Sequence, residues 1–167
     1  MKRLSLVFLL ALLGCGTAKK ITEESFFDSK VNAQQAAIEK AGPAPKGGSK
    51  PWMPVALYMD SYDGAAMDTA AFEWQVRYLG HLLDENKRLK PPPDLEAYHG
   101  GKLRSFQASV DILSEALVEC ISPGNMIDGK HPKMQNLRKR WLSETQTMNA
   151  DPAEKRYAEF INKRAAQ

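Results

Sequence analysis

The sequence has few of the residues that build most metal and redox sites: 2 cysteines and 3 histidines in 167 residues. It contains no CxxCH, HExxH, GxSxG, P-loop or GxGxxG pattern. No apolar run approaches the ~20 residues that a membrane-spanning helix needs. These absences argue against the common haem, zinc-protease, hydrolase and nucleotide-binding templates, and against a permanent transmembrane helix.

The N-terminus has a secretory pattern. Lys2 and Arg3 precede a segment, Leu4 to Leu13, in which every residue except Ser5 is apolar. A positive start followed by a short apolar core is typical of a signal peptide. The run is about half the length of a bilayer span, so we expect a segment that is removed.

The residues that end this run, Leu12-Leu13-Gly14-Cys15, resemble the lipobox of bacterial lipoprotein precursors. The resemblance covers only residues 1 to 16. It implies diacylglycerol on the thiol of Cys15, cleavage after Gly14 and often a third acyl chain such as palmitate on the new amino group. The alternative is an ordinary secretory peptide or a buried N-terminal helix that ends in Gly-Cys.

A chain that carries two or more acyl groups stays on its membrane. By the same resemblance, an Asp directly after the lipidated cysteine favours the inner membrane, and this chain has Gly16 there. We therefore expect the outer membrane, with the protein facing the periplasm. Lipidation of Cys15 leaves Cys120 as an odd thiol and rules out an intramolecular disulfide.

Neither sign of charge dominates. The chain has 23 basic and 20 acidic side chains, and removal of Lys2 and Arg3 with residues 1 to 14 leaves 21 basic and 20 acidic ones. A body so close to neutral disfavours bulk nucleic-acid binding, so we expect no nucleic-acid partner.

Composition divides the chain into four parts: a signal peptide (1–14), a lipid-anchored tether with a weak helix (15–40), a linker (41–54) and a helical domain (55–167). Thr22 can cap the weak helix, whose polar majority makes its burial doubtful. The linker has four prolines and three glycines, which favour extended chain. This pattern predicts a membrane-proximal arm that stands apart from the body.

Apolar residues recur at helical spacing through the body. We expect a short helix at 55–62 and main helices at 68–89, 102–121, 132–148 and from 152 onward, with a break at Gly100-Gly101 and starts at Asp68, Pro132 and Asp151. No segment alternates convincingly as a strand. The predicted fold class is all-α, an antiparallel bundle of about four main helices preceded by the helical arm and the Pro/Gly-rich linker.

Candidate metal ligands do not form a recognisable set. Asp60, Asp63, Gly64 and Asp68 look calcium-like, but an EF-hand loop that starts at Asp60 would place Tyr62 and Ala71 at positions that require oxygen ligands. A turn and a helix cap explain them better. His81, His99 and His131 are expected at surface or capping positions.

Cys120 lies at the edge of an apolar stripe, where a buried inert thiol is favoured over a nucleophile or an intermolecular disulfide. Trp52 and Trp74 are expected to pack on the added segments rather than to serve as exposed anchors for a partner.

Residues 130 to 140 contain basic side chains and no acid. Lys130, Lys133, Arg138 and Arg140 therefore form a candidate surface for an anionic partner such as lipid headgroups or an acidic protein. The alternative is a solvated helix whose cations lie around Trp141.

Together these features predict a non-enzymatic, membrane-anchored lipoprotein that serves as a scaffold, tether or accessory protein for another envelope protein. No catalytic residue, cofactor or metal site is predicted. The alternative is a helical bundle that binds haem, metal or lipid, or is catalytic.

Overall fold

The computed structural model describes residues 20–45, 59 and 67–166, and within them the all-α bundle is confirmed. The helices are α1 (Glu23–Ala41), α3 (Thr69–Lys87), α4 (Glu96–Glu119), α5 (Pro132–Asn149) and α6 (Pro152–Ala165), with a 3-10 turn η1 (Pro93–Leu95) before α4. The helix expected at 55–62 lies outside the described residues apart from Met59, which is fully buried.

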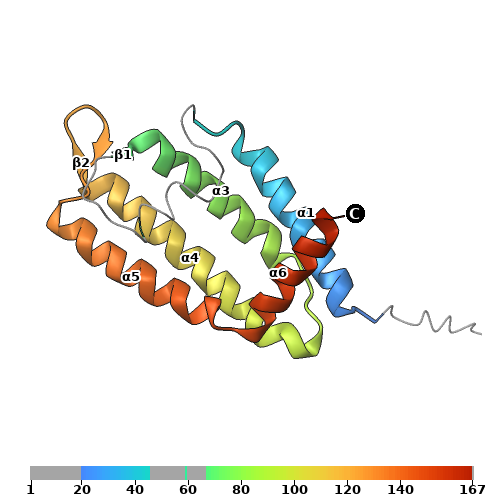
Figure 1. Ribbon diagram of the computed structural model, residues 1–167. Coiled ribbons are helices and arrows are strands. Elements are labelled where there is room, and N and C mark those ends of the chain that lie inside the picture. Colours follow the sequence, from blue (N-terminus) through green and yellow to red (C-terminus); the bar gives the residue numbers. More distant parts are fainter. Residues whose placement is uncertain (1–19, 46–58, 60–66, 167) are drawn as a thin grey trace, which may run out of the picture.

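Four of these helices form the bundle and the fifth crosses it (Figure 1). α3 packs against both α1 and α4, and α4 packs against α5. Successive members of this set run in opposite directions, while α6 lies across the N-terminal half of α1 (Figure 1). Arg156 and Arg164 of α6 form ion pairs with Glu23 and Asp28 of α1.

Local capping explains where the helices begin. Asp68 and Asp151 each accept a backbone hydrogen bond from the residue two positions later, at 2.8 Å, as expected for helix N-caps. Thr22 forms a capping box with Ser25, and Pro132 begins α5 behind a His131 cap. These starts, predicted from the sequence, are confirmed.

The expectation that residues 22–40 form an arm apart from the body is wrong, because α1 is a wall of the bundle. Its buried face consists of Phe26, Phe27, Lys30, Ala33, Ala37 and Ala41. The alanines lie against α3 where small side chains permit close approach, and the indole Nε1 of Trp74 donates to the carbonyl of Gly42 at 3.0 Å. The sequence does not reveal this packing, because alanine contributes little to an apolar count while it packs well.

The break expected at Gly100-Gly101 is also absent, since α4 passes through both residues. A Cβ on Gly101 would lie 2.7 Å from the sulfur of Met148, so the missing side chain lets α5 approach. The buried positions of α4 include Ser105 and Ser109, whereas Phe106 is only partly buried.

A small sheet, not predicted, closes one end of the bundle. β1 (Met67–Asp68), β2 (Ile121–Ser122) and β3 (Met126–Ile127) pair antiparallel in the order β1-β3-β2. Gly124 and Asn125 between β2 and β3 have φ of 86° and 58°, which turns the chain back. Strands of two residues cannot show the alternation from which strands are predicted.

The core consists of two hydrophobic clusters. The larger one joins α1, α3, α4 and α5 around Phe72, Leu113 and Leu137. The smaller one gathers Phe26, Phe27, Leu95, Tyr98 and Met148 where α6 crosses. Among the described residues, no helix combines the length and apolar character needed to span a membrane.

If α1 is a wall of the bundle, Ala37→Glu should unfold the protein at markedly lower urea concentration, because it places a carboxylate at a position with 0% exposure. We expect a loss on the order of 3 kcal/mol in the free energy of unfolding, followed by far-UV circular dichroism. Asn32→Glu, on the exposed side of the same helix, is the matched control. Equal, small effects of the two changes would contradict the packing of α1.

Candidate ligand-binding cavity

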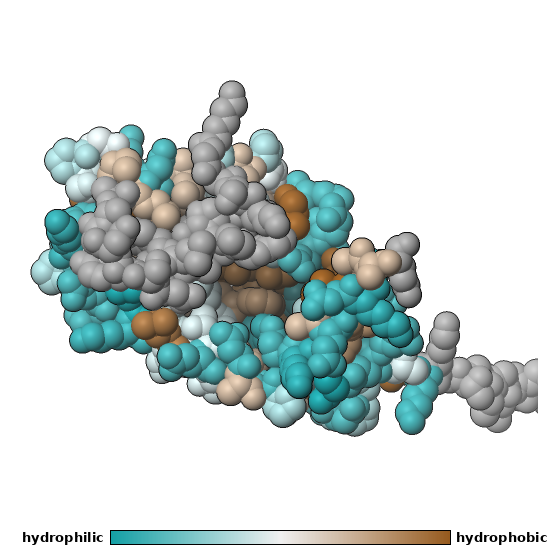
Figure 2. All heavy atoms as spheres, in the orientation of Figure 1, coloured by the Kyte–Doolittle hydropathy of each residue, from teal (hydrophilic) through white to brown (hydrophobic). Residues whose placement is uncertain are grey.

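A cavity of about 430 Å³ opens between the two hydrophobic clusters. All five α-helices of the described residues contribute to its lining: α1, α3, α4, α5 and α6 are represented by Lys30, Leu82, Phe106, Trp141 and Tyr157. Figure 2 shows hydrophobic surface at the bottom of a hollow where α3, α4 and α6 meet in Figure 1. The volume lies in the ~300–1,000 Å³ range of small-molecule sites.

Lys30 is the most unusual residue of this lining. It lies on the buried face of α1 and is 4% exposed. Its ammonium lies 5.2 Å from the ring centroid of Tyr98, 5.3 Å from that of Tyr157 and 5.8 Å from that of Phe26. Within the described part of the chain it donates to no oxygen and forms no ion pair, so aromatic faces are its main compensation.

Glu154 organises the polar end of the cavity. Its two carboxylate oxygens accept from the hydroxyl of Tyr98 at 2.6 Å and from the ammonium of Lys102 at 3.0 Å. The carboxylate thus joins α6 to α4 and is already occupied by two donors. The charge of Glu154 raises the pKa of Lys30 without a direct contact between the two side chains.

Burial governs the ionisation of these groups. Desolvation, aided by the charge of Lys102 and opposed by that of Glu154, lowers the pKa of Lys30 to about 8. Desolvation raises the pKa of Tyr78 to about 12 and also raises the pKa values of Tyr98 and Tyr157. The phenols are therefore neutral at physiological pH, whereas Lys30 keeps most of its charge.

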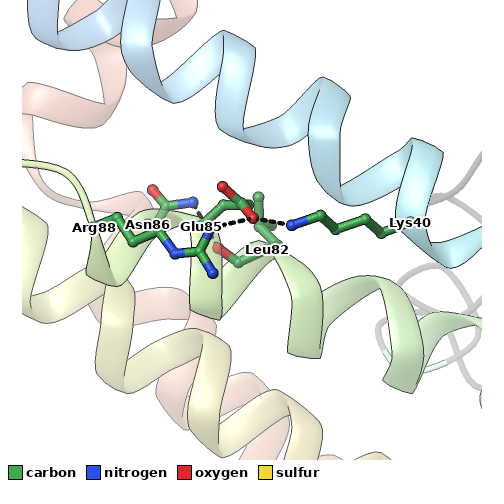
Figure 3. A network of polar contacts seen from close by, with 5 residues as sticks. All are labelled: Lys40, Leu82, Glu85, Asn86 and Arg88. Atoms are coloured by element: carbon green, nitrogen blue, oxygen red, sulfur yellow. Dashed lines mark hydrogen bonds and ion pairs between the residues drawn. The ribbon is translucent and has the colours of Figure 1, made fainter.

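A polar network borders the cavity where α1 meets α3 (Figure 3). Glu85 of α3 accepts from Lys40 of α1 and from Arg88 at 3.2 Å, and the hydrogen bond from Lys40 is the main reason that the pKa of Glu85 lies below its usual value. Next to it, Asn86 Nδ2 donates to the carbonyl of Leu82 at 2.8 Å. Asn86 Oδ1 is buried without a partner among the described residues, so this side of the cavity offers an unused acceptor.

The basic residues predicted to bind an anionic partner are largely engaged with this chain's own groups. Glu115 of α4 pairs with Lys133 at 2.7 Å and with Arg140 at 2.6 Å, and Lys133 also reaches Glu119 at 3.3 Å. These pairs lower the pKa of Glu115 and raise that of Lys133.

Two further cations of the predicted surface are placed differently. Arg138 donates to the carbonyl of Met59 at 2.8 Å. Lys130 is exposed, and its ammonium has no ion pair among the described residues. A shared anionic-partner surface therefore stays a prediction, with less free charge than the sequence suggests. Cys15, the predicted lipidation site, lies outside the described residues.

The histidines do not converge. His81 lies on α3 and His131 caps α5. The expectation of a surface or capping position is wrong for His99, which is buried in α4 with its ring edge-on to Phe26 at 5.3 Å. Desolvation lowers the pKa of His99. Across residues 20–45, 59 and 67–166, no group of three or more potential ligands could hold a metal ion. Asp68 of the calcium-like pattern is a helix cap, and the rest of that pattern lies outside the described residues.

Two expectations about packing are confirmed. Cys120 is fully buried, and desolvation raises the pKa of its thiol, as befits an inert core residue. Trp74 is 3% exposed, stacks on Tyr78 and contacts the end of α1. Trp52 lies outside the described residues.

Sequence reasoning missed Lys30, Lys102, Tyr98, Asn86 and Glu154 as site residues. One signal for Lys30 was present: it follows Phe26 and Phe27 at four and three residues, so it shares their helix face. When all other side chains on one face of a helix are small or aromatic, a lysine on that face indicates a buried cation. Nothing in the sequence indicated that Glu154, far along the chain, lies beside it.

Comparisons with family models, with curated proteins and with solved structures gave no match to this chain. The site is therefore interpreted from its own geometry.

Replacing the buried cation should stabilise the protein. Lys30→Met keeps the length of the side chain and removes a charge whose burial is unfavourable, while Glu154 retains its two donors. Because the pKa of Lys30 is about 8 in the folded protein and that of an ordinary lysine is 10.5, the unfolded chain binds more protons between these values. The stability of the wild type therefore rises with pH across this window.

We expect the advantage of Lys30→Met to be largest at pH 7 and to shrink by about 2 kcal/mol towards pH 10. Urea unfolding of both proteins at a series of pH values measures this difference, and other titrating groups cancel in the comparison. A variant that is less stable than the wild type at pH 7, or a difference that does not change with pH, would refute a buried Lys30 that lacks an ion pair among the described residues.

Proposed function

We infer that the protein is a lipid-anchored, non-enzymatic envelope protein that holds its bundle at the membrane surface and presents its far end to a partner protein. The observation that carries this proposal is the packing of α1. Cys15 precedes Glu23 by eight residues, a span of at most about 28 Å at ~3.5 Å per residue. Because α1 is part of the bundle, lipid on Cys15 would hold the whole body, and not only an arm, near the bilayer.

The end of the bundle that carries the sheet faces away from the start of α1 (Figure 1). There Val118 is 80% exposed and Ile121 is 51% exposed. Lys130, one of the predicted contact residues, is in the connection from this sheet to α5 and is exposed. Two exposed apolar side chains and a cation without an ion pair among the described residues support a contact with an apolar, acidic patch on a partner. We call Val118, Ile121 and Lys130 the distal surface.

A second candidate function is ligand binding inside the bundle. The observation in its favour is the cavity, in which an ammonium lacks a counter-ion within the described residues. The two candidates are compatible, because the cavity and the distal surface use different residues.

Site-specific photo-crosslinking in cells tests the first candidate. A photoreactive residue at Val118 or Ile121 should yield the same adduct with one envelope protein, and Lys130→Glu should reduce its yield several-fold because it reverses a contact charge. Cys15→Ala should leave the precursor unprocessed and abolish the adduct, because the thioether is the predicted anchoring point.

A photoreactive residue at Lys163, exposed on α6, is the matched control and should give no such adduct. An adduct that forms equally from position 163, or that persists with Cys15→Ala, would rule out a membrane-held distal surface.

A further inference from the structure

We propose that the cavity between the two hydrophobic clusters binds a monoanionic amphiphile, with the negative group on Lys30 and the apolar body along Leu79, Leu82 and Phe106. The inference rests on the second candidate function, ligand binding in the bundle, and does not depend on the lipid anchor.

The charge of the polar end favours a ligand with one negative charge. Lys102 and Glu154 form an ion pair at 3.0 Å, and their charges offset each other. Lys30 contributes the remaining positive charge. A ligand with a single negative charge would neutralise the site, whereas a cation would add to Lys30 in a poorly solvated space. A dianionic phosphate monoester would leave one negative charge uncompensated.

Because Lys30 is buried in the wall of the cavity, an anion would bind it inside the protein and not at the surface. The residue is 4% exposed and lines the cavity, and its ammonium lies over aromatic rings with no hydrogen bond or ion pair within the described part of the chain. A carboxylate that reaches it would form a charge-assisted hydrogen bond in a region of low dielectric. The ammonium lies over the rings of Tyr98 and Tyr157, and among the described residues no oxygen accepts from it.

The rest of the lining suits an apolar body. Leu79, Leu82, Phe106 and Trp141 give the cavity apolar walls. The ring of Phe106 also lies 5.8 Å from the ammonium of Lys102, so this wall reaches the polar end. Ser105 and Ser109 leave room on α4 because their side chains are small. The hydroxyl of Ser109 donates to the carbonyl of Ser105 at 2.8 Å. Small side chains at these two positions keep α4 from filling the space, so the cavity exists because of the sequence there.

The test uses the chain from residue 16, which retains every described element, and three probes that share a ten-carbon body: decanoate, decanol and decyltrimethylammonium. Isothermal titration calorimetry gives each affinity, below the micellar concentrations of the two ionic probes and below the solubility limit of decanol. We expect one site, with decanoate bound at least tenfold more tightly than decanol and no binding of the cation.

Two variants and a control locate the site. Lys30→Met should reduce decanoate affinity at least tenfold and leave decanol affinity unchanged. Ser109→Leu should weaken both probes, because it fills the cavity and leaves Lys30 in place. Lys139→Met, an exposed lysine of α5, should change neither. Circular dichroism establishes that each variant keeps its helical content.

The pH profile is a second readout. Above pH 8 the free Lys30 is increasingly neutral and must take up a proton to bind an anion, so decanoate affinity should fall between pH 7 and pH 9.5 while that of decanol stays constant. The titratable groups around Lys30 are Lys102, Glu154, His99, Tyr98, Tyr157 and Tyr78. The three phenols have raised pKa values and His99 a lowered one, so these four stay neutral across the window.

The possible results distinguish failure of the ligand-binding candidate from failure of the monoanion inference. Binding of none of the probes would overturn the ligand-binding candidate itself. Equal binding of decanoate and decanol, or decanoate binding that Lys30→Met does not weaken, would overturn the monoanion inference and leave an apolar cavity. If decanoate binds as expected, displacement by phosphatidylglycerol vesicles but not by phosphatidylcholine vesicles assigns the anion to a lipid headgroup, and no displacement assigns it to a free carboxylate.

Discussion

The packing of α1 against α3 is the constraint on which the rest of the structure depends. It covers Trp74 and Tyr78, brings Lys30 into the bundle and lets α6 bridge back to Glu23 and Asp28. Lys40 and Glu85 add an ion pair at the same interface (Figure 3). Without α1, the cavity would lose one wall and its cation, and the bundle would lose its short link to Cys15.

The interior illustrates a compromise between stability and a binding surface. A fully apolar bundle could close the space between its two clusters, yet this one retains Lys30, Glu154, Lys102 and two serines there. Desolvation of an ammonium without a carboxylate partner is unfavourable, and aromatic faces offset only part of that cost. Such an arrangement is typical of functional sites, where local stability is lower than packing alone would allow.

Much of the fold was predictable because its signals are local. Asp68 and Asp151 mark helix starts by accepting a hydrogen bond from the backbone N–H two positions later, and Pro132 marks one through its fixed φ at the first helical position. The structure has the helices there. The role of α1 was not predictable in the same way, because Ala33, Ala37 and Ala41 acquire meaning only from the helix opposite. The role of Gly101 likewise depends on Met148, nearly fifty residues later, whose sulfur lies where a Cβ would have to fit.

The candidate site was even less accessible to sequence reasoning. Lys133 and Arg140 form a basic cluster in the sequence, but Glu115 on another helix pairs with both. Conversely, Lys30 and Glu154 carry no motif and become a site only through the crossing of α6. Charge can be counted along a chain, whereas compensation of charge depends on tertiary contacts.

Native-state hydrogen exchange of the α1 amides tests the central claim most directly, because it reports whether this helix opens with the bundle or independently of it. The account predicts that the amides from Phe27 to Lys40 exchange as slowly as those of α3 and that both helices share one free energy of opening. Exchange of α1 at the rate of an unprotected peptide, with α3 and α4 still protected, would contradict it.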